Sequence, residues 1–294
     1  MGESGSDAGL NVPGRNKRVT KLKSACWLSL GAIALSGCLY AYQRPWRLFE
    51  SLEAYDDIPL PRDGQDPAEF VFARLMYPSL PYAKFEFRGR RDWREGGTSW
   101  TEDYPRADRH FLTALRRLSR VDARSLEQPV NPDDVDDIYN WPWLYSGLTG
   151  NWDLTDEQAA KIREYLLRGG FFYADDFWGP DEWRGFEAGM KKIFPNRDIV
   201  ELTNEEALFH IVYDLNDRYQ ILGEWGLRRG PRDGGITPHW LGVRDDKGRL
   251  MVTVSFNSDI GDSWEFADAP AYPERFSALG IRIGVNYVLY SMAH

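Results

Sequence analysis

One stretch, LLRGGFFYADDFW at residues 166–178, constrains the fold of this chain more than any other part of the sequence. A helix is expected before it, because Thr155 can cap a helix N-terminus and two acidic residues follow in the first turn. The paired glycines are suited to end that helix and to turn the chain into a strand. No polar residue interrupts the strand before Asp175, which is typical of a central strand covered by helices on both faces.

The rest of the chain alternates predicted strands and helices. Apolar runs predict the strands, and apolar residues at helical spacing predict the helices between them. This alternation favours a three-layer α/β fold with a mainly parallel sheet. The expected strands cover residues 70–77, about 121–126, about 138–145, 171–174 and 250–256, and the expected helices cover a segment after Pro105 and residues 183–193 and 281–292.

Cysteine content and charge exclude several classes of protein. Both cysteines, Cys26 and Cys38, lie in the N-terminal region, so disulfides, cysteine metal sites and a cysteine nucleophile are excluded from residues 69–294. Residues 1–47 hold seven Lys and Arg against two acidic residues, whereas the remainder holds 29 against 43. Such an acidic domain lacks the basic surface that phosphate contacts need, so no nucleic-acid partner is expected.

The N-terminal region has the pattern of a membrane anchor. Residues 1–24 form a basic tail, and residues 25–42 are an uncharged stretch close to the length of a bilayer-spanning helix. Positive charge before the span predicts a cytoplasmic N-terminus and a periplasmic C-terminal domain at the bacterial inner membrane. The bilayer is therefore the expected partner of residues 25–42, and the aromatic residues expected at its interfaces are Trp27, Tyr40, Tyr42 and Trp46.

A lipoprotein signal is the alternative for the same region. Leu35-Ser36-Gly37-Cys38 is similar to a lipobox, and in that case residues 1–37 would be removed and Cys38 would carry the lipid. Residues 43–68 contain several prolines and are expected to be an extended linker. The folded domain is expected at residues 69–294, with a long loop at residues 78–104 on its functional face.

Several sequence blocks resemble an uncharacterised bacterial domain family of unknown function with a class I glutamine-amidotransferase-like fold. Members of this family often follow an N-terminal membrane segment. The blocks lie at residues 70–77, 100–108, 166–176, 257–265, 272–273 and 284–290. The resemblance implies a flavodoxin-like or amidotransferase-like three-layer sheet, but no activity. In the wider superfamily the strand that ends here at Ala174 leads to a cysteine nucleophile, and this sequence has Asp175 and Asp176 there instead.

Asp175 and Asp176 are the first candidates for chemistry, because ligands of open α/β sheets bind at the carboxyl ends of the strands. They could act as a general acid/base pair or as oxygen ligands for Ca²⁺ or Mg²⁺. Neighbouring residues on an extended segment point in opposite directions, so one of the two is expected to face the cleft. The structural alternative is that one caps the next turn and the other pairs with an arginine.

Two further groups of residues are weaker candidates. Four oxygen-bearing side chains follow the predicted strand at 250–256 and could ligate a metal, although their spacing is not that of an EF-hand and favours a tight loop. His239, between a proline and a tryptophan, is a candidate for the cleft. The four histidines show no zinc-binding spacing, and no cofactor motif is present. The possible metal ligands are Asn257, Asp259, Asp262 and Glu265.

The sequence therefore predicts a membrane-anchored, extracytoplasmic, non-catalytic binding or scaffold protein. The absent nucleophile, the anchor and the abundant Trp and Tyr favour an accessory subunit of a larger membrane complex, for example a respiratory or photosynthetic one. The alternative is an enzyme or ligand binder of the cell envelope that uses Asp175 and Asp176 on a carbohydrate-like substrate.

Overall fold

The computed structural model describes residues 1–2, 46–55, 59–64, 66–81, 83 and 92–294. Contacts divide the chain into Met1–Arg44 and a compact unit, Pro45–His294. The expected anchor at residues 25–42, with Trp27, Cys38, Tyr40 and Tyr42, lies outside the described residues. Within the described ranges, no helix combines the length and apolar character needed to span a bilayer.

The compact unit is built on a seven-stranded sheet with the order β2-β1-β3-β4-β7-β6-β5. Neighbouring strands in the part β2-β1-β3-β4-β7 are parallel to one another. Strand β6 runs antiparallel to both of its neighbours, β7 and β5. The sequence prediction of a mixed α/β fold with a mainly parallel sheet is therefore confirmed. The strands are β1 (Ala73–Leu75), β2 (Gln128–Val130), β3 (Trp143–Ser146), β4 (Phe171–Phe177), β5 (Val200–Glu201), β6 (His239–Arg244) and β7 (Leu250–Phe256).

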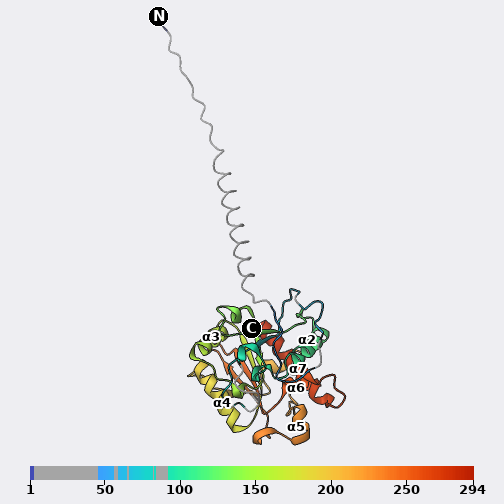
Figure 1. The fold of residues 1–294 in the computed structure, drawn as a ribbon. Helices are drawn as coiled ribbons and strands as arrows, with labels where there is room; N and C mark the ends of the chain where they lie inside the picture. Colours follow the sequence, from blue (N-terminus) through green and yellow to red (C-terminus); the bar gives the residue numbers. More distant parts are fainter. Residues whose placement is uncertain (3–45, 56–58, 65, 82, 84–91) are drawn as a thin grey trace. The chain divides into compact units, whose positions relative to one another are not determined.

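Helices cover both faces of this sheet (Figure 1). On β4, Phe171 and Tyr173 belong to one buried core, while Phe172 and Ala174 belong to the other. This alternation explains the uninterrupted apolar run of β4, because each face of the strand has its own layer of helices. The first face packs against α2 (Arg106–Leu118), α6 (Ile260–Glu265) and α7 (Glu274–Ala293), and the second against α3 (Asp156–Leu167) and α4 (Gly179–Ile193).

The start of α3 and the turn from α3 into β4 both follow the sequence prediction. Thr155 and Gln158 form a capping box in which the Thr155 hydroxyl accepts a 3.2 Å bond from the Gln158 amide. Gly169 has a φ of 113°, which L side chains rarely adopt. A side chain at Gly170 would lie 2.3 Å from the ring of Tyr165, so both glycines are needed where the sequence has them.

Other elements differ from the prediction. β1 is shorter than the strand expected at residues 70–77. The strand expected at 121–126 is not formed: within it only Ala123 makes an isolated bridge, to Phe70, and β2 begins later in the chain. The β5–β6 pair was not predicted, because Gly242 interrupts the apolar pattern of β6 and glycine weakens the signal of a strand. Short 3₁₀ helices lie in the connections, at Trp93–Glu95, Ser99–Thr101, Asp137–Asn140, Thr149–Asn151, Ala207–His210 and Arg232–Gly234, and α5 is Glu224–Arg229.

The described part of residues 43–68 also differs from the expected extended linker. The ring of Phe49 packs edge-on against Trp100, with 5.3 Å between the centroids. The amide of Gly97 donates a 2.7 Å bond to the carbonyl of Glu50. Trp46, expected at a membrane interface, is half-buried in this unit. Burial of apolar side chains outweighs the extended tendency of the prolines here, so this segment belongs to the domain.

Candidate functional site: a pocket beside a cluster of carboxylates

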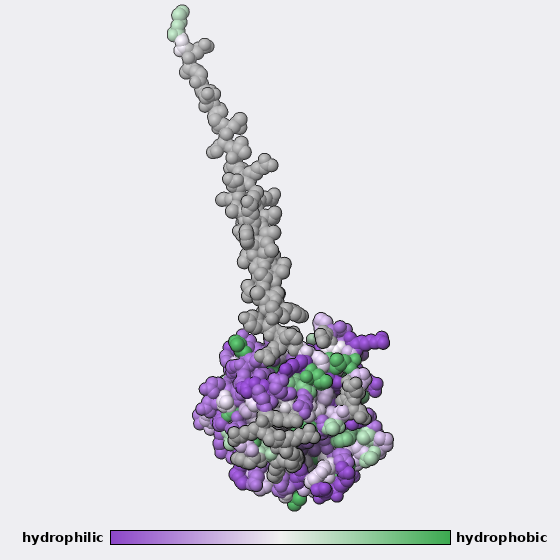
Figure 2. All heavy atoms as spheres, viewed as in Figure 1, coloured by the Kyte–Doolittle hydropathy of each residue, from purple (hydrophilic) through white to green (hydrophobic). Residues whose placement is uncertain are grey.

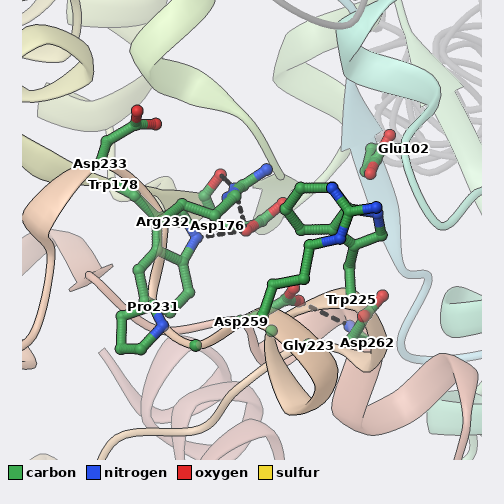
Figure 3. A pocket seen from close by; sticks show the side chains of 13 residues that line it. Glu102, Asp176, Trp178, Gly223, Trp225, Pro231, Arg232, Asp233, Asp259 and Asp262 are labelled. Carbon is green, nitrogen blue, oxygen red and sulfur yellow. Dashed lines mark hydrogen bonds and ion pairs between the residues drawn. The ribbon is translucent and has the colours of Figure 1, made fainter.

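A pocket of about 690 Å³ lies at the carboxyl ends of β4 and β7, where an open α/β sheet binds ligands. Its lining combines carboxylates, two arginines and two tryptophans (Figure 3). Carboxylates outnumber arginines, so the pocket is acidic. The lining residues are Glu102, Asp176, Trp178, Gly223, Trp225, Gly226, Arg229, Gly230, Pro231, Arg232, Asp233, Asp259 and Asp262.

Asp176 is the last residue but one of β4, where the pairing of β4 with β7 is irregular; it has a φ of 50°, and its side chain is nearly fully buried. Its Oδ1 accepts bonds of 2.7 Å from the indole nitrogen of Trp178 and from Nη2 of Arg232. Figure 3 shows this carboxylate held between the two side chains, while Asp233 points away from them. Burial raises the pKa of Asp176, and the charge of Arg232 opposes that shift.

Asp175 is fully buried and does not line the pocket. Its Oδ2 accepts a 2.8 Å bond from each of the amides of Ile260 and Gly261, at the first turn of α6, and a 3.3 Å bond from the hydroxyl of Tyr145. Burial and the charge of Asp176 raise the pKa of Asp175 well above its usual value. The pairing of Asp176 with an arginine is as the structural alternative expected, whereas Asp175 caps α6, which is distant in sequence, and not the next turn.

Five carboxylates gather beside the pocket, and we call them the carboxylate cluster. Carboxylate oxygens of Asp103, Asp262 and Glu265, one from each residue, all lie within 4.8 Å of one another. The same holds for Glu53, Glu102 and Asp103, so Asp103 belongs to both groups. Glu53 comes from the segment before β1, Glu102 and Asp103 from the loop before α2, and Asp262 and Glu265 from one face of α6.

The electrostatics of this cluster favour uptake of positive charge. Burial, with the charge of Asp262 next, raises the pKa of Glu265 to about 8. Burial, with the charge of Asp176 next, raises the pKa of Asp262 to about 6. The pKa of Asp103 is raised well above its usual value by burial and by neighbouring carboxylates. In the part of the chain that the structure describes, neither Asp103, Asp262 nor Glu265 forms an ion pair with a lysine or arginine.

Two glycines leave space for these carboxylates. A Cβ on Gly261, in α6, would lie 2.0 Å from Oδ2 of Asp103. A Cβ on Gly223 would lie 2.1 Å from Oδ2 of Asp259 and 2.5 Å from Oδ2 of Asp262. Any side chain at either position would displace a carboxylate, so the glycines keep the acidic groups in place.

The structure divides the four predicted metal ligands. Asp262 and Glu265 join the carboxylate cluster, whereas Asp259 caps α6 by accepting a 2.9 Å bond from the amide of Asp262 and also lines the pocket. Asn257 has a loop-fixing role: its Oδ1 accepts from the amide of Gly179 and its Nδ2 donates to a backbone carbonyl. The four residues do not form a single site.

His239 lies apart from the acidic pocket, at the start of β6. Its side chain is 41% exposed, and its Nδ1 lies 3.1 Å from a carboxylate oxygen of Glu201. It borders a separate pocket of about 440 Å³ with Pro180 and Trp183. The structure therefore does not bring His239 together with Asp175 or Asp176 in one pocket lining.

Sequence reasoning missed Glu53, Glu102, Asp103 and Arg232. The Glu102-Asp103 pair did lie within a block that carries the family resemblance and at the end of the loop expected on the functional face. Glu53 carried no signal, because it lies in a segment that the sequence presents as a linker. Arg232 sits in a glycine-rich loop, and only the fold brings it to Asp176.

These features define a mixed α/β domain with an acidic pocket at the carboxyl edge of its sheet. Residues 90–292 match the family model described as Domain of unknown function (DUF4159), and the chain belongs to this family. The matched region contains the pocket lining and every member of the carboxylate cluster except Glu53. No curated protein matches the chain.

Proposed function

We propose that this domain is a non-catalytic binding module for a small polyhydroxylated, carbohydrate-like ligand. The pocket lining is the observation that carries the proposal. Asp176, Asp259 and Asp262 offer carboxylate oxygens that accept hydrogen bonds from hydroxyl groups. Trp178 and Trp225 offer apolar faces beside them, and a few polar groups among apolar walls are typical of small-molecule sites.

The positions of the two aspartates favour binding over acid/base catalysis. Asp175 is occupied by two amides of α6 and lies outside the pocket lining. Asp176 is held by Arg232 and Trp178. A general acid or base needs a proton path to the substrate, and this arrangement gives Asp175 none. The cell-envelope enzyme therefore ranks below the binding module.

An amidotransferase-like fold is part of the proposal. The parallel arrangement of β2, β1, β3, β4 and β7 supports it, as does the sharp turn from β4 into α4. Asp176 has a φ of 50° just before that turn, at the irregularity near the end of β4, and a strained residue close to the end of a strand is also a feature of a strand-to-helix elbow. In this interpretation the elbow is retained and an ion-paired aspartate takes the position of the nucleophile.

We also propose that residues 25–42 tether the domain to the inner membrane and that the protein is an accessory subunit of a membrane complex. The uncharged stretch and the basic residues before it support the tether. On the face shown in Figure 2 the described surface of the domain is mainly hydrophilic, with small apolar patches. Gentle detergent extraction followed by native electrophoresis tests this role: stoichiometric co-migration with a larger complex supports it, and migration alone contradicts it.

Ligand binding is tested with the full-length protein in detergent. Monosaccharides, disaccharides and soluble cell-wall fragments are titrated while saturation-transfer NMR and tryptophan fluorescence report binding. Trp225→Ala should weaken binding of the responding sugar by at least tenfold, or about 1.4 kcal/mol, because a half-exposed indole at the pocket is lost.

Val135→Ala is the matched control, because Val135 is 75% exposed and lies outside the pocket lining. It should leave binding of the sugar unchanged. Equal affinity of the Trp225→Ala variant and the wild type, or no response to any sugar class, would contradict the proposed ligand.

A further inference from the structure

Three carboxylates from two distant parts of the sequence converge on one point beside the pocket. Asp103 comes from the loop before α2, and Asp262 and Glu265 come from α6. One oxygen of each lies within 4.8 Å of the others, so a single ion could contact all three after small side-chain adjustments. Asp103 and Glu265 are each 2% exposed, and Asp262 is half-buried towards the pocket.

A second observation concerns Asp103 alone. Its Oδ2 is buried and accepts a hydrogen bond from no donor in the described residues. This atom lies against Gly261, where the missing side chain leaves room for it. Leaving a carboxylate oxygen buried without a donor or cation is costly, because the group loses water and gains no partner. The described residues thus hold Oδ2 of Asp103 in place without supplying a hydrogen-bond donor or a positive charge for it.

We propose that Asp103, Asp262 and Glu265 bind a hard divalent cation of the Ca²⁺, Mg²⁺ or Mn²⁺ class. The ligand set contains only oxygen, which these ions prefer, and the absence of histidine and cysteine from it disfavours Zn²⁺. The two positive charges on the ion offset two of the three carboxylates. Water molecules and the adjacent Glu53 and Glu102 are available to complete the six to eight oxygen ligands typical of Ca²⁺.

This site stands independently of the proposed sugar ligand. Asp262 borders both the cation position and the pocket, because it also lines the pocket wall. Asp103 and Glu265 do not line the pocket. Variants of these two residues therefore test the cation without removing a proposed sugar contact.

The full-length protein is treated with EDTA, dialysed, and titrated with MnCl₂ while electron paramagnetic resonance measures free Mn²⁺. Parallel calorimetric titrations use CaCl₂ and MgCl₂. We expect saturable binding of one ion per chain with a dissociation constant below ~1 mM. Glu265→Gln and Asp103→Asn should each weaken that binding by at least tenfold, because each removes a charged ligand. No saturable binding of any of the three ions would overturn the proposal.

Asp246→Asn is the matched control, since Asp246 is 89% exposed and pairs with Arg197 on the surface. It should bind the ion as the wild type does. Equal weakening in this control, or full binding in both cluster variants, would show adventitious surface binding and would also overturn the proposal.

Two measurements distinguish a bound cation from bound protons and from a bound sugar. Glu265→Gln replaces a buried carboxyl group with a neutral amide of the same shape, so the variant should fold even where Asp103→Asn does not. The wild type should gain thermal stability on addition of Ca²⁺ or Mn²⁺, and Glu265→Gln should not. If both respond equally, the cluster holds only protons and the proposal is wrong. Trp225→Ala should lose sugar binding but keep Mn²⁺ binding, so failure of one proposal leaves the other distinguishable.

Discussion

Two sets of buried charges adjoin the loop before α2, and they are neutralised differently. In the first set, Arg74 pairs with Asp108 through bonds of 2.5 and 2.9 Å, and its guanidinium also donates to the carbonyls of Trp100 and Glu102. In the second set, Asp103 faces Asp262 and Glu265, and within the described residues no arginine or lysine pairs with these three.

The two sets differ in whether the chain itself supplies the opposite charge. Asp108 has its opposite charge within the chain, because Arg74 pairs with it and opposes the burial that raises the pKa of Asp108 to about 6. The carboxylate cluster has no such balance among the described residues, so it must take up protons or a cation from outside. A buried acidic group without a partner is costly to stability, and groups with strongly shifted pKa values are found often at functional sites.

The largest effect on stability is expected from breaking the Arg74–Asp108 pair. Asp108→Ala leaves Arg74 buried without its carboxylate, which should lower the free energy of unfolding by ~3–5 kcal/mol. Chemical denaturation of the full-length protein measures this loss. Asp181→Ala is the control, because Asp181 pairs with Arg184 at the surface, where a pair contributes ~1 kcal/mol or less. Similar losses in both variants would contradict the comparison.

The pH dependence of stability tests the second set, Asp103, Asp262 and Glu265. In the native state the pKa of Glu265 is raised to about 8 and that of Asp262 to about 6, mainly by burial. Both values exceed those of the unfolded chain, so the folded protein binds more protons between about pH 4 and 8. Stability of the EDTA-treated protein should therefore fall as pH rises through that window, by on the order of a few kcal/mol.

The Glu265→Gln variant sharpens this measurement. It should show a weaker fall in stability and, at pH 8, a higher melting temperature than the metal-free wild type, because it cannot ionise. Addition of Ca²⁺ should flatten the wild-type profile, since the cation replaces the proton. A stability that instead rises from pH 5 to 8 in the wild type would show that these carboxylates are balanced after all.

Gly261→Ala changes the cluster through the backbone position that makes room for it. The added methyl group would lie 2.0 Å from Oδ2 of Asp103, so we expect a loss of ~1–3 kcal/mol in stability and weaker Mn²⁺ binding. Gly147→Ala is the control, because the nearest atom to its new methyl group is 3.9 Å away. Thermal melts and Mn²⁺ titration compare the two variants. An unchanged melting temperature for Gly261→Ala would contradict the close contact between Gly261 and Oδ2 of Asp103.

The smallest effect is expected at His239. His239→Ala removes a half-exposed contact with Glu201 at a different pocket, so stability should change by less than ~0.5 kcal/mol. Binding of Mn²⁺ and of the responding sugar should remain at the wild-type level. A loss of either binding would show that His239 contributes to the acidic site and would contradict its separation from the carboxylate cluster.

The fold was largely predictable, whereas the site was predictable only in part. The capping residue Thr155, the paired glycines and the apolar run of β4 act locally, so their patterns predicted the central strand and its preceding helix. Asp176 was found through its position at the end of that strand. Asp103 was not, because its partners Asp262 and Glu265 lie far along the chain and no spacing rule joins them.

Local sequence alone specifies the class of fold, the acidic character of the domain and the edge of the sheet at which polar groups gather. These properties follow from local propensity, hydrophobic periodicity and charge, which each segment carries independently of the others. The capping of α6 by Asp175, the pairing of Asp176 with Arg232 and the meeting of Asp103 with Asp262 and Glu265 arise only in the folded chain. Such pairings depend on packing between elements distant in sequence, and packing is settled only when the whole core forms.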